Sequence, residues 1–96
     1  LSSKYPNSRY ADNAQYQRAD VDFEKGNYPA AVAGFTRVIE SNAGSGVVPF
    51  ALQKRALAYS NQQQYDKAIA DYQRILDQYP TSKVSNSALL GLQEAL

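Results

Sequence analysis

Three carboxylates lie close together in one stretch of the sequence, where they could serve acid–base or metal chemistry: Asp20, Asp22 and Glu24. Residues four apart share a helix face, so Asp20 and Glu24 could act as a pair, whereas Asp22 lies on another face. The chain has no histidine and no cysteine, which leaves carboxylates, lysine, tyrosine and serine for acid, base or nucleophile roles. A solvated helix face is the commoner role of such charges. We therefore expect no catalytic residue, no metal site and no cofactor, and predict that the protein is not an enzyme.

The composition indicates one folded domain and argues against two classes of partner. Hydrophobic residues make up 44% of the 96 residues, which is close to the value of globular proteins. The net charge is +1, with ten basic and nine acidic residues interspersed, so the basic stripe of a nucleic-acid-binding protein is missing. No apolar run approaches the roughly 18 residues of a membrane span. We expect no nucleic-acid partner and no membrane insertion.

The sequence repeats itself with a period of 37 residues, and each repeat has a helical pattern. The stretches YPAAVAGFTRVIES and YDKAIADYQRILDQ begin 37 residues apart, at Tyr28 and Tyr65. Their apolar residues follow the i, i+3, i+4, i+7 spacing of an amphipathic helix. Upstream, the matched residues are Ala14 with Ala51 and Ala88, Arg18 with Arg55, and Ala19 with Ala56. Each repeat is therefore predicted to be a pair of helices.

Turn residues give the ends of the expected helices. Gly26 and the glutamines at 62–64 separate the two helices of each pair, and Tyr-Pro-x-Ser occurs twice, at 5–8 and 79–82, where Ser8 and Ser82 could cap the following helix. The helices are predicted at about 8–25, 28–42, 47–62, 65–79 and 83–95, and no segment shows the alternation of a strand.

The pattern resembles the tetratricopeptide repeat, which has a small residue in the first helix, Gly-x-Tyr at the turn, an alanine and then an aromatic residue in the second helix, and a proline at its end. The residues in these places are Ala19, Gly26, Tyr28, Ala31 and Phe35 in one unit and Ala56, Tyr65, Ala68, Tyr72 and Pro80 in the next. The resemblance implies an all-α fold, a right-handed α-solenoid of two full repeats (about 8–43 and 47–80) plus a final helix (about 83–95), in a single domain over 1–96. Because the sequence contains no methionine, we also expect it to be a piece excised from a longer repeat protein.

The joint between repeats resembles that of a bacterial envelope subgroup of the family, of the outer-membrane-assembly lipoprotein and Tol–Pal coordinator type. Its marks are Tyr-Pro-x-Ser with an alanine six residues after the serine, as in Ser8 to Ala14 and Ser82 to Ala88. This resemblance implies a place in the bacterial periplasm or at the outer membrane rather than in the cytoplasm.

The first repeat departs from the family pattern. Gln15 and Arg18 stand where large apolar residues are usual, Arg55 repeats the second departure, and Gly34 lies inside a predicted helix, where glycine costs about 1 kcal/mol relative to alanine. Ala43-Gly44-Ser45-Gly46 replaces the usual proline joint. We therefore expect the first repeat to be the less stable one.

In this family one face of the first helix of each repeat lines a concave groove, and the resemblance implies a contact surface for a protein or peptide partner there. The residues at these positions are Asn13, Tyr16, Asp20, Phe23, Phe50, Gln53, Leu57 and Ser60. Packing within the protein is the alternative role, above all for Phe50 and Leu57. The Lys, Asn and Arg clamp of the chaperone-binding members is absent, because Tyr16, Asp20, Gln53 and Leu57 take its places.

The leading functional hypothesis is a protein–protein interaction scaffold, and the alternative is a solenoid spacer with no partner of its own. Exposed aromatic side chains in the groove would favour binding, and a groove filled by the protein's own side chains would favour the spacer. The last predicted helix ends in SALLGLQEAL, whose leucines cover more than one helix face. We expect weak self-association through Leu90 and Leu96, giving a weak homodimer.

Overall fold

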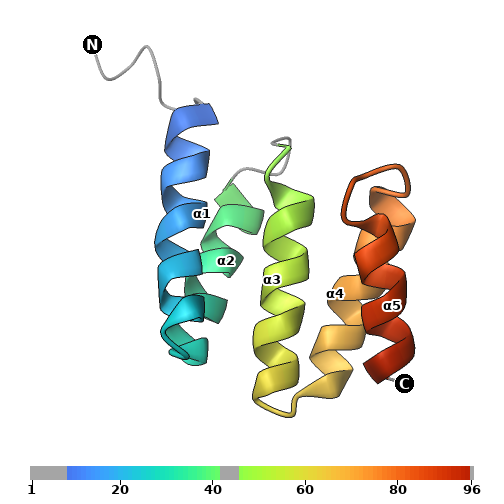
Figure 1. Cartoon of the computed structure of the whole chain (residues 1–96). Coiled ribbons are helices and arrows are strands. Elements are labelled where there is room, and N and C mark those ends of the chain that lie inside the picture. The colour runs from blue at the N-terminus through green and yellow to red at the C-terminus, as the bar shows by residue number, and fades with distance from the viewer. Residues whose placement is uncertain (1–8, 42–45, 96) are drawn as a thin grey trace.

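The computed structural model describes residues 9–41 and 46–95, with side chains from Ala14 onward, and contains only helices within these residues. The helices are α1 (Arg9–Glu24), α2 (Tyr28–Ser41), α3 (Val48–Asn61), α4 (Tyr65–Gln78) and α5 (Ser85–Ala95) (Figure 1). Every end lies within two residues of its predicted place, and the prediction of an all-α repeat solenoid is confirmed. None of these helices is long and apolar enough to cross a membrane.

The helices form two layers (Figure 1). Each helix packs on the next one along the chain, and α3 also contacts both α1 and α5. No such contact joins α2 to α4 within the described residues. The first helices of the units therefore converge on one side of the stack, while the second helices spread apart on the other. This arrangement makes the α1, α3 and α5 side the inner face of the solenoid.

Two turns of the same construction close the first helix of each repeat. After α1, the backbone N–H of Asn27 donates to Asp22 O at 2.9 Å, and Gly26 has a φ of +80°. After α3, the N–H of Gln64 donates to Tyr59 O at 2.8 Å, and Gln63 has a φ of +63°. This left-handed residue, followed by a long backward hydrogen bond, is the Schellman ending of a helix.

The core runs along the stack and combines small residues at helix crossings with larger ones between them. The buried alanines Ala19, Ala31, Ala56 and Ala68 let helices of one repeat approach closely, and the largest fully buried side chains are Phe35, Leu52, Ile75, Val38 and Val48. Ala51 and Ala88 are also buried, but their match Ala14 is exposed. The difference follows from the stack, because a preceding repeat covers α3 and α5, whereas none among the described residues covers α1.

Arg55, which departs from the family pattern, is held by a polar network between three helices. Its guanidinium donates to both carboxylate oxygens of Asp71 in α4, at 2.8 and 2.6 Å, and to Thr36 Oγ1 in α2, at 3.1 Å. Thr36 Oγ1 in turn donates to Val32 O at 2.7 Å. The buried carboxylate of Asp71 is thus fully paired, and Arg55 fills the space between the second helices of the two repeats.

The second Tyr-Pro-x-Ser joint forms a compact turn before α5. Tyr79 packs partly buried against the core, and Ser82 Oγ accepts a hydrogen bond from the N–H of Val84 at 3.3 Å. The hydroxyl of Ser85 donates to Ser82 O at 2.7 Å, so α5 begins at Ser85, two residues later than predicted. The first copy of this joint, at 5–8, and most of the glycine-containing link after α2 lie outside the described residues.

Candidate functional site

The inner faces of α1 and α3 bring two predicted groove residues, Asp20 and Phe23, close to a lysine that the sequence reasoning missed. The ammonium of Lys54 lies 3.2 Å from Asp20 Oδ1 and 4.9 Å from the centre of the Phe23 ring. Both charged side chains are partly exposed, at 26% for Lys54 and 33% for Asp20. The pair is therefore within reach of a partner, and an ion pair this exposed contributes only about 0–1 kcal/mol to stability.

Asp20 is only partly satisfied within the protein. Its Oδ1 atom is shielded from solvent and has no hydrogen bond, although the Lys54 ammonium lies nearby as an ion pair. The short distance gives Coulomb attraction, but the angle of approach is outside hydrogen-bond geometry. Because Oδ1 is shielded from solvent, a partner would reach the pair through the exposed remainder of the Asp20 side chain and through the Lys54 ammonium.

The aromatic residues of α1 are partly buried in the protein's own packing. The Tyr16 ring lies 5.5 Å from that of Phe35, and the Phe23 ring meets the edge of Tyr28 at 5.6 Å. Burial, and secondarily the Asp20 carboxylate, raise the pKa of Tyr16 to about 12. These rings thus border the groove while also contributing to the core.

The other predicted groove residues whose side chains the structure describes lie along α3. Phe50, Gln53, Leu57 and Ser60 are all partly buried, and Phe50 packs against the core. The side chain of Asn13 lies outside the described residues.

Leu57 and Ser60 line a hollow of about 150 Å³ where α3, α4 and α5 meet. Its other lining residues are Tyr65, Tyr72, Gly91, Glu94 and Ala95, from α4 and α5. Gly91 occupies the place that Lys54 has one repeat earlier, and the Tyr72 ring packs closely against it, so this junction has no counterpart of the Lys54 ammonium.

A signal for Lys54 was present in the sequence. Phe50, Lys54 and Leu57 have the i, i+4, i+7 spacing of one helix face, so Lys54 shares a side with two predicted groove residues. Only the rotation of α1 against α3, which the sequence does not give, places its ammonium beside Asp20.

The three carboxylates considered for catalysis lie in three different surroundings. Asp20 faces Lys54, Asp22 lines a separate cavity between α1 and α2, and Glu24 is exposed. Within the described residues, no three histidine, cysteine, aspartate or glutamate side chains are grouped so that they could hold a metal ion.

The sequence of α3, α4 and the following joint identifies the repeat. Residues 50–82 match the sequence profile of the tetratricopeptide repeat family. This segment is similar to a tetratricopeptide repeat. Tetratricopeptide repeats generally mediate protein–protein interactions and are generally not catalytic. A search of curated proteins finds no match to the chain.

The matched segment covers about a third of the chain, and the same helical arrangement extends to both sides of it. The pair α1 and α2 lies 37 residues earlier in the sequence, with Ala19, Ala31 and Phe35 buried like Ala56, Ala68 and Tyr72 of the matched tetratricopeptide repeat. The helix α5 packs on α4 and α3 in the way that α3 packs on α2 and α1.

Proposed function

We propose that this domain is a non-catalytic interaction module that binds a protein or peptide partner along the inner face of α1 and α3. The observation that carries the proposal is the partly exposed Asp20–Lys54 pair beside the Phe23 ring. Such a pair offers a partner one acceptor and one donor next to an apolar surface. An extended or helical peptide that carries an apolar side chain flanked by polar groups would fit this chemistry.

The hollow beside Leu57 and Ser60 supports a binding surface that continues toward α5. It lies on the next junction of first helices, between α3 and α5, and two tyrosines contribute to its lining. Tyrosine presents a large apolar area with a hydroxyl at its end, and is enriched in protein interfaces. A partner that spans both junctions would contact the charged pair at one place and the tyrosine-lined hollow at the other.

A solenoid spacer is the second candidate, and one observation favours it. The rings of Tyr16, Phe23 and Phe50 pack partly against the core, so the protein's own packing takes up part of the aromatic surface. In a spacer, the Asp20–Lys54 pair would only join neighbouring helices.

Peptide selection followed by nuclear magnetic resonance mapping separates the two candidates. A displayed library of random peptides is selected on the folded domain, and a selected peptide is titrated into the ¹⁵N-labelled protein. We expect amide shifts in α1 and α3, centred on Asp20 and Gln53. Lys54→Glu should weaken binding about tenfold or more, whereas Lys83→Glu, at an exposed lysine in the turn before α5, should not. Failure to select any peptide, or shifts confined to α2 and α4, would favour the spacer.

We further propose a bacterial envelope location, in the periplasm or at the outer membrane rather than in the cytoplasm. The support is the joint at 79–82 and the 37-residue period, which resemble those of envelope members of the family. Cell fractionation of a bacterium that carries the intact parent protein tests this, and recovery of that protein solely in the cytoplasmic fraction would contradict it.

A further inference from the structure

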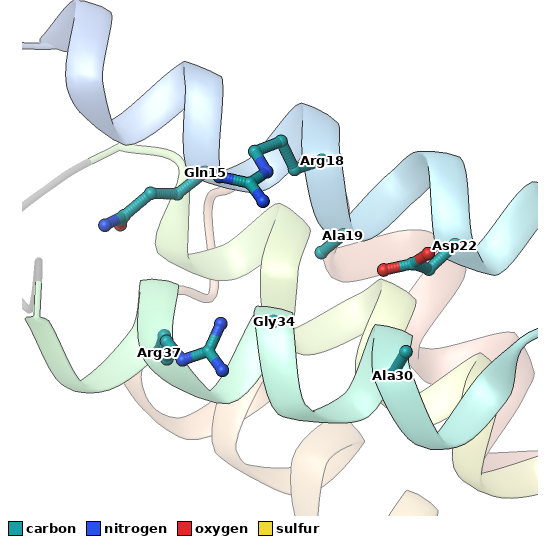
Figure 2. A pocket seen from close by; sticks show the side chains of 7 residues that line it. All are labelled: Gln15, Arg18, Ala19, Asp22, Ala30, Gly34 and Arg37. Atoms are coloured by element: carbon teal, nitrogen blue, oxygen red, sulfur yellow. The ribbon is translucent and has the colours of Figure 1, made fainter.

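A cavity of about 160 Å³ lies between α1 and α2, on a different face of α1 from the groove residues Asp20 and Phe23. Its lining residues are Gln15, Arg18, Ala19, Asp22, Ala30, Gly34 and Arg37. Figure 2 shows the guanidinium groups of Arg18 on α1 and Arg37 on α2 at the end of the gap near Gly34, and the Asp22 carboxylate nearer Ala30. Neither guanidinium has a hydrogen bond or ion pair within the described part of the chain.

In the second repeat, the position equivalent to this cavity is occupied by a side chain. Arg55 is 37 residues after Arg18, and Asp71 is 37 residues after Gly34. In the second repeat the Asp71 carboxylate accepts hydrogen bonds at 2.8 and 2.6 Å from the Arg55 guanidinium. The first repeat has the equivalent arginine, Arg18, but it has a glycine, Gly34, at the position where Asp71 supplies the carboxylate.

Smaller or more polar side chains leave further space in the first repeat. The second repeat has the buried Leu52 and the ring of Tyr59 where the first has Gln15 and Asp22. The Tyr59 ring lies 5.7 Å from the Arg55 guanidinium and covers it. In the first repeat no aromatic ring is in this place, so the cavity remains between the helices.

We propose that this cavity binds a carboxylate from outside the domain, in the place that Asp71 takes in the second repeat. Two planar guanidinium groups face the cavity, and each can donate a pair of parallel hydrogen bonds to a carboxylate. They outnumber the single carboxylate of Asp22, so the lining is net positive at neutral pH. The bound group is either the side chain of an aspartate or glutamate on a protein partner or a free small carboxylate. The inference does not depend on binding in the groove.

The test is a titration of the ¹⁵N-labelled domain with three probes: sodium glutarate, the peptide acetyl-Gly-Glu-Gly-amide, and inorganic phosphate. We expect saturable shifts at the amides of Ala19 and Gly34 and at the Nε–H signals of Arg18 and Arg37 with a carboxylate probe. Tighter binding of the peptide than of glutarate identifies a partner's side chain as the ligand, and tighter binding of glutarate identifies a small carboxylate.

Matched variants distinguish the cavity from general charge effects. Arg18→Gln with Arg37→Gln should abolish the saturable shifts, and Arg18→Lys, which keeps the charge but loses the planar fork, should weaken binding about tenfold. Arg74→Gln, which removes the arginine 37 residues after Arg37, should bind as the wild type does. Linear shifts without saturation, equal binding by the folded Arg18→Lys variant, or saturation by phosphate alone would overturn the proposal.

Discussion

Gly26 and Gln63 take the same place in two repeats, and both adopt the left-handed conformation, with φ of +80° and +63°. Only the first is a residue that adopts this conformation without steric cost. For a residue with a Cβ, the left-handed region costs about 1–2 kcal/mol. The hydrogen bonds of the turn are the same in both repeats, which shows that the surrounding fold imposes the conformation on Gln63.

Gln63→Gly should therefore stabilise the domain, by about 1 kcal/mol, because it removes this strain at the end of α3. The preceding residue is a matched control, since Gln62 has an ordinary negative φ of −94°. Gln62→Gly should give no stabilisation. Urea unfolding followed by circular dichroism measures both changes, and equal effects of the two substitutions would contradict the assigned turn.

Tyr16 should make the domain lose stability at alkaline pH. Burial raises the pKa of Tyr16 from 10.0 to about 12, so the folded state holds the phenolic proton more tightly than the unfolded chain. The stability that this difference in pKa gives to the folded state is fully present below pH 10, and it is lost as the pH rises through about 12. Tyr16→Phe should therefore show a smaller fall in Tm than the wild type between about pH 8 and about pH 11.

Tyr65→Phe, which removes the hydroxyl of a ring that is 47% exposed, is the control for this measurement. Burial raises the pKa of Tyr72 as well, so part of the alkaline loss should remain in Tyr16→Phe. An unchanged pH dependence of Tm in Tyr16→Phe would show that the phenol is not buried as described.

The helices α1 and α2 approach each other closely at Gly34, and this contact explains a residue that the sequence marks only as unfavourable. A Cβ atom added at Gly34 would lie 2.7 Å from the Cβ of Ala19, which is itself buried and has no flexible end that could move away. The glycine therefore allows the helices of the first repeat to pack, and its cost in helix propensity is offset by this contact.

Gly34→Ala should consequently destabilise the domain, by about 1–2 kcal/mol, although alanine is the better helix former by about 1 kcal/mol. Gly46→Ala is the control, because an added Cβ there meets nothing within 4 Å. That change should be neutral or slightly stabilising. Thermal unfolding of both variants provides the measurement, and a raised Tm for Gly34→Ala would refute the close contact.

Periodicity was sufficient to predict the helices, but not the side-chain pairs between them. The apolar spacing and the turns gave all five helices, since both depend on neighbours in the sequence. Arg55 and Asp71 lie on different helices 16 residues apart, and Asp20 and Lys54 lie on helices two apart in the stack. Such pairs depend on how each helix is rotated about its axis, which a single sequence does not determine.

The charged cavity of the first repeat illustrates the same limit. In the sequence, Gln15, Arg18 and Gly34 are departures from the family pattern and indicate only lower stability. The structure places all three around one cavity. Comparison with the pair formed by Arg55 and Asp71 was needed to show what this cavity lacks.

The stack as a whole has apolar side chains exposed on α5. Leu90 is 61% exposed and Leu89 is 46% exposed, while Leu92 packs partly buried against the core. Leu96 lies outside the described residues. A helical repeat normally has its outer apolar surface covered by the next repeat or by polar capping residues. A second copy of this domain is the cover that we expect at high protein concentration.

We therefore expect weak self-association through α5. Burial of two leucines contributes roughly 3–5 kcal/mol before the cost of association, so we expect only a weak dimer that becomes detectable near millimolar concentration. Leu90→Glu should abolish it, whereas Val21→Glu, at a valine on α1 that is 51% exposed, should leave it intact. Sedimentation equilibrium tests both variants, and a monomeric wild type at millimolar concentration would refute the expectation.

The packing of each helix mainly on its neighbours in the sequence also affects how fast the domain folds. Almost every contact between helices joins elements that are adjacent or two apart along the chain. Formation of such contacts closes only short loops, so little chain entropy is lost before the first favourable packing is gained. Helical proteins with contacts of this kind fold in microseconds to milliseconds. The domain should thus be fully folded soon after α5 leaves the ribosome, with α1 and α2 already paired before synthesis is complete.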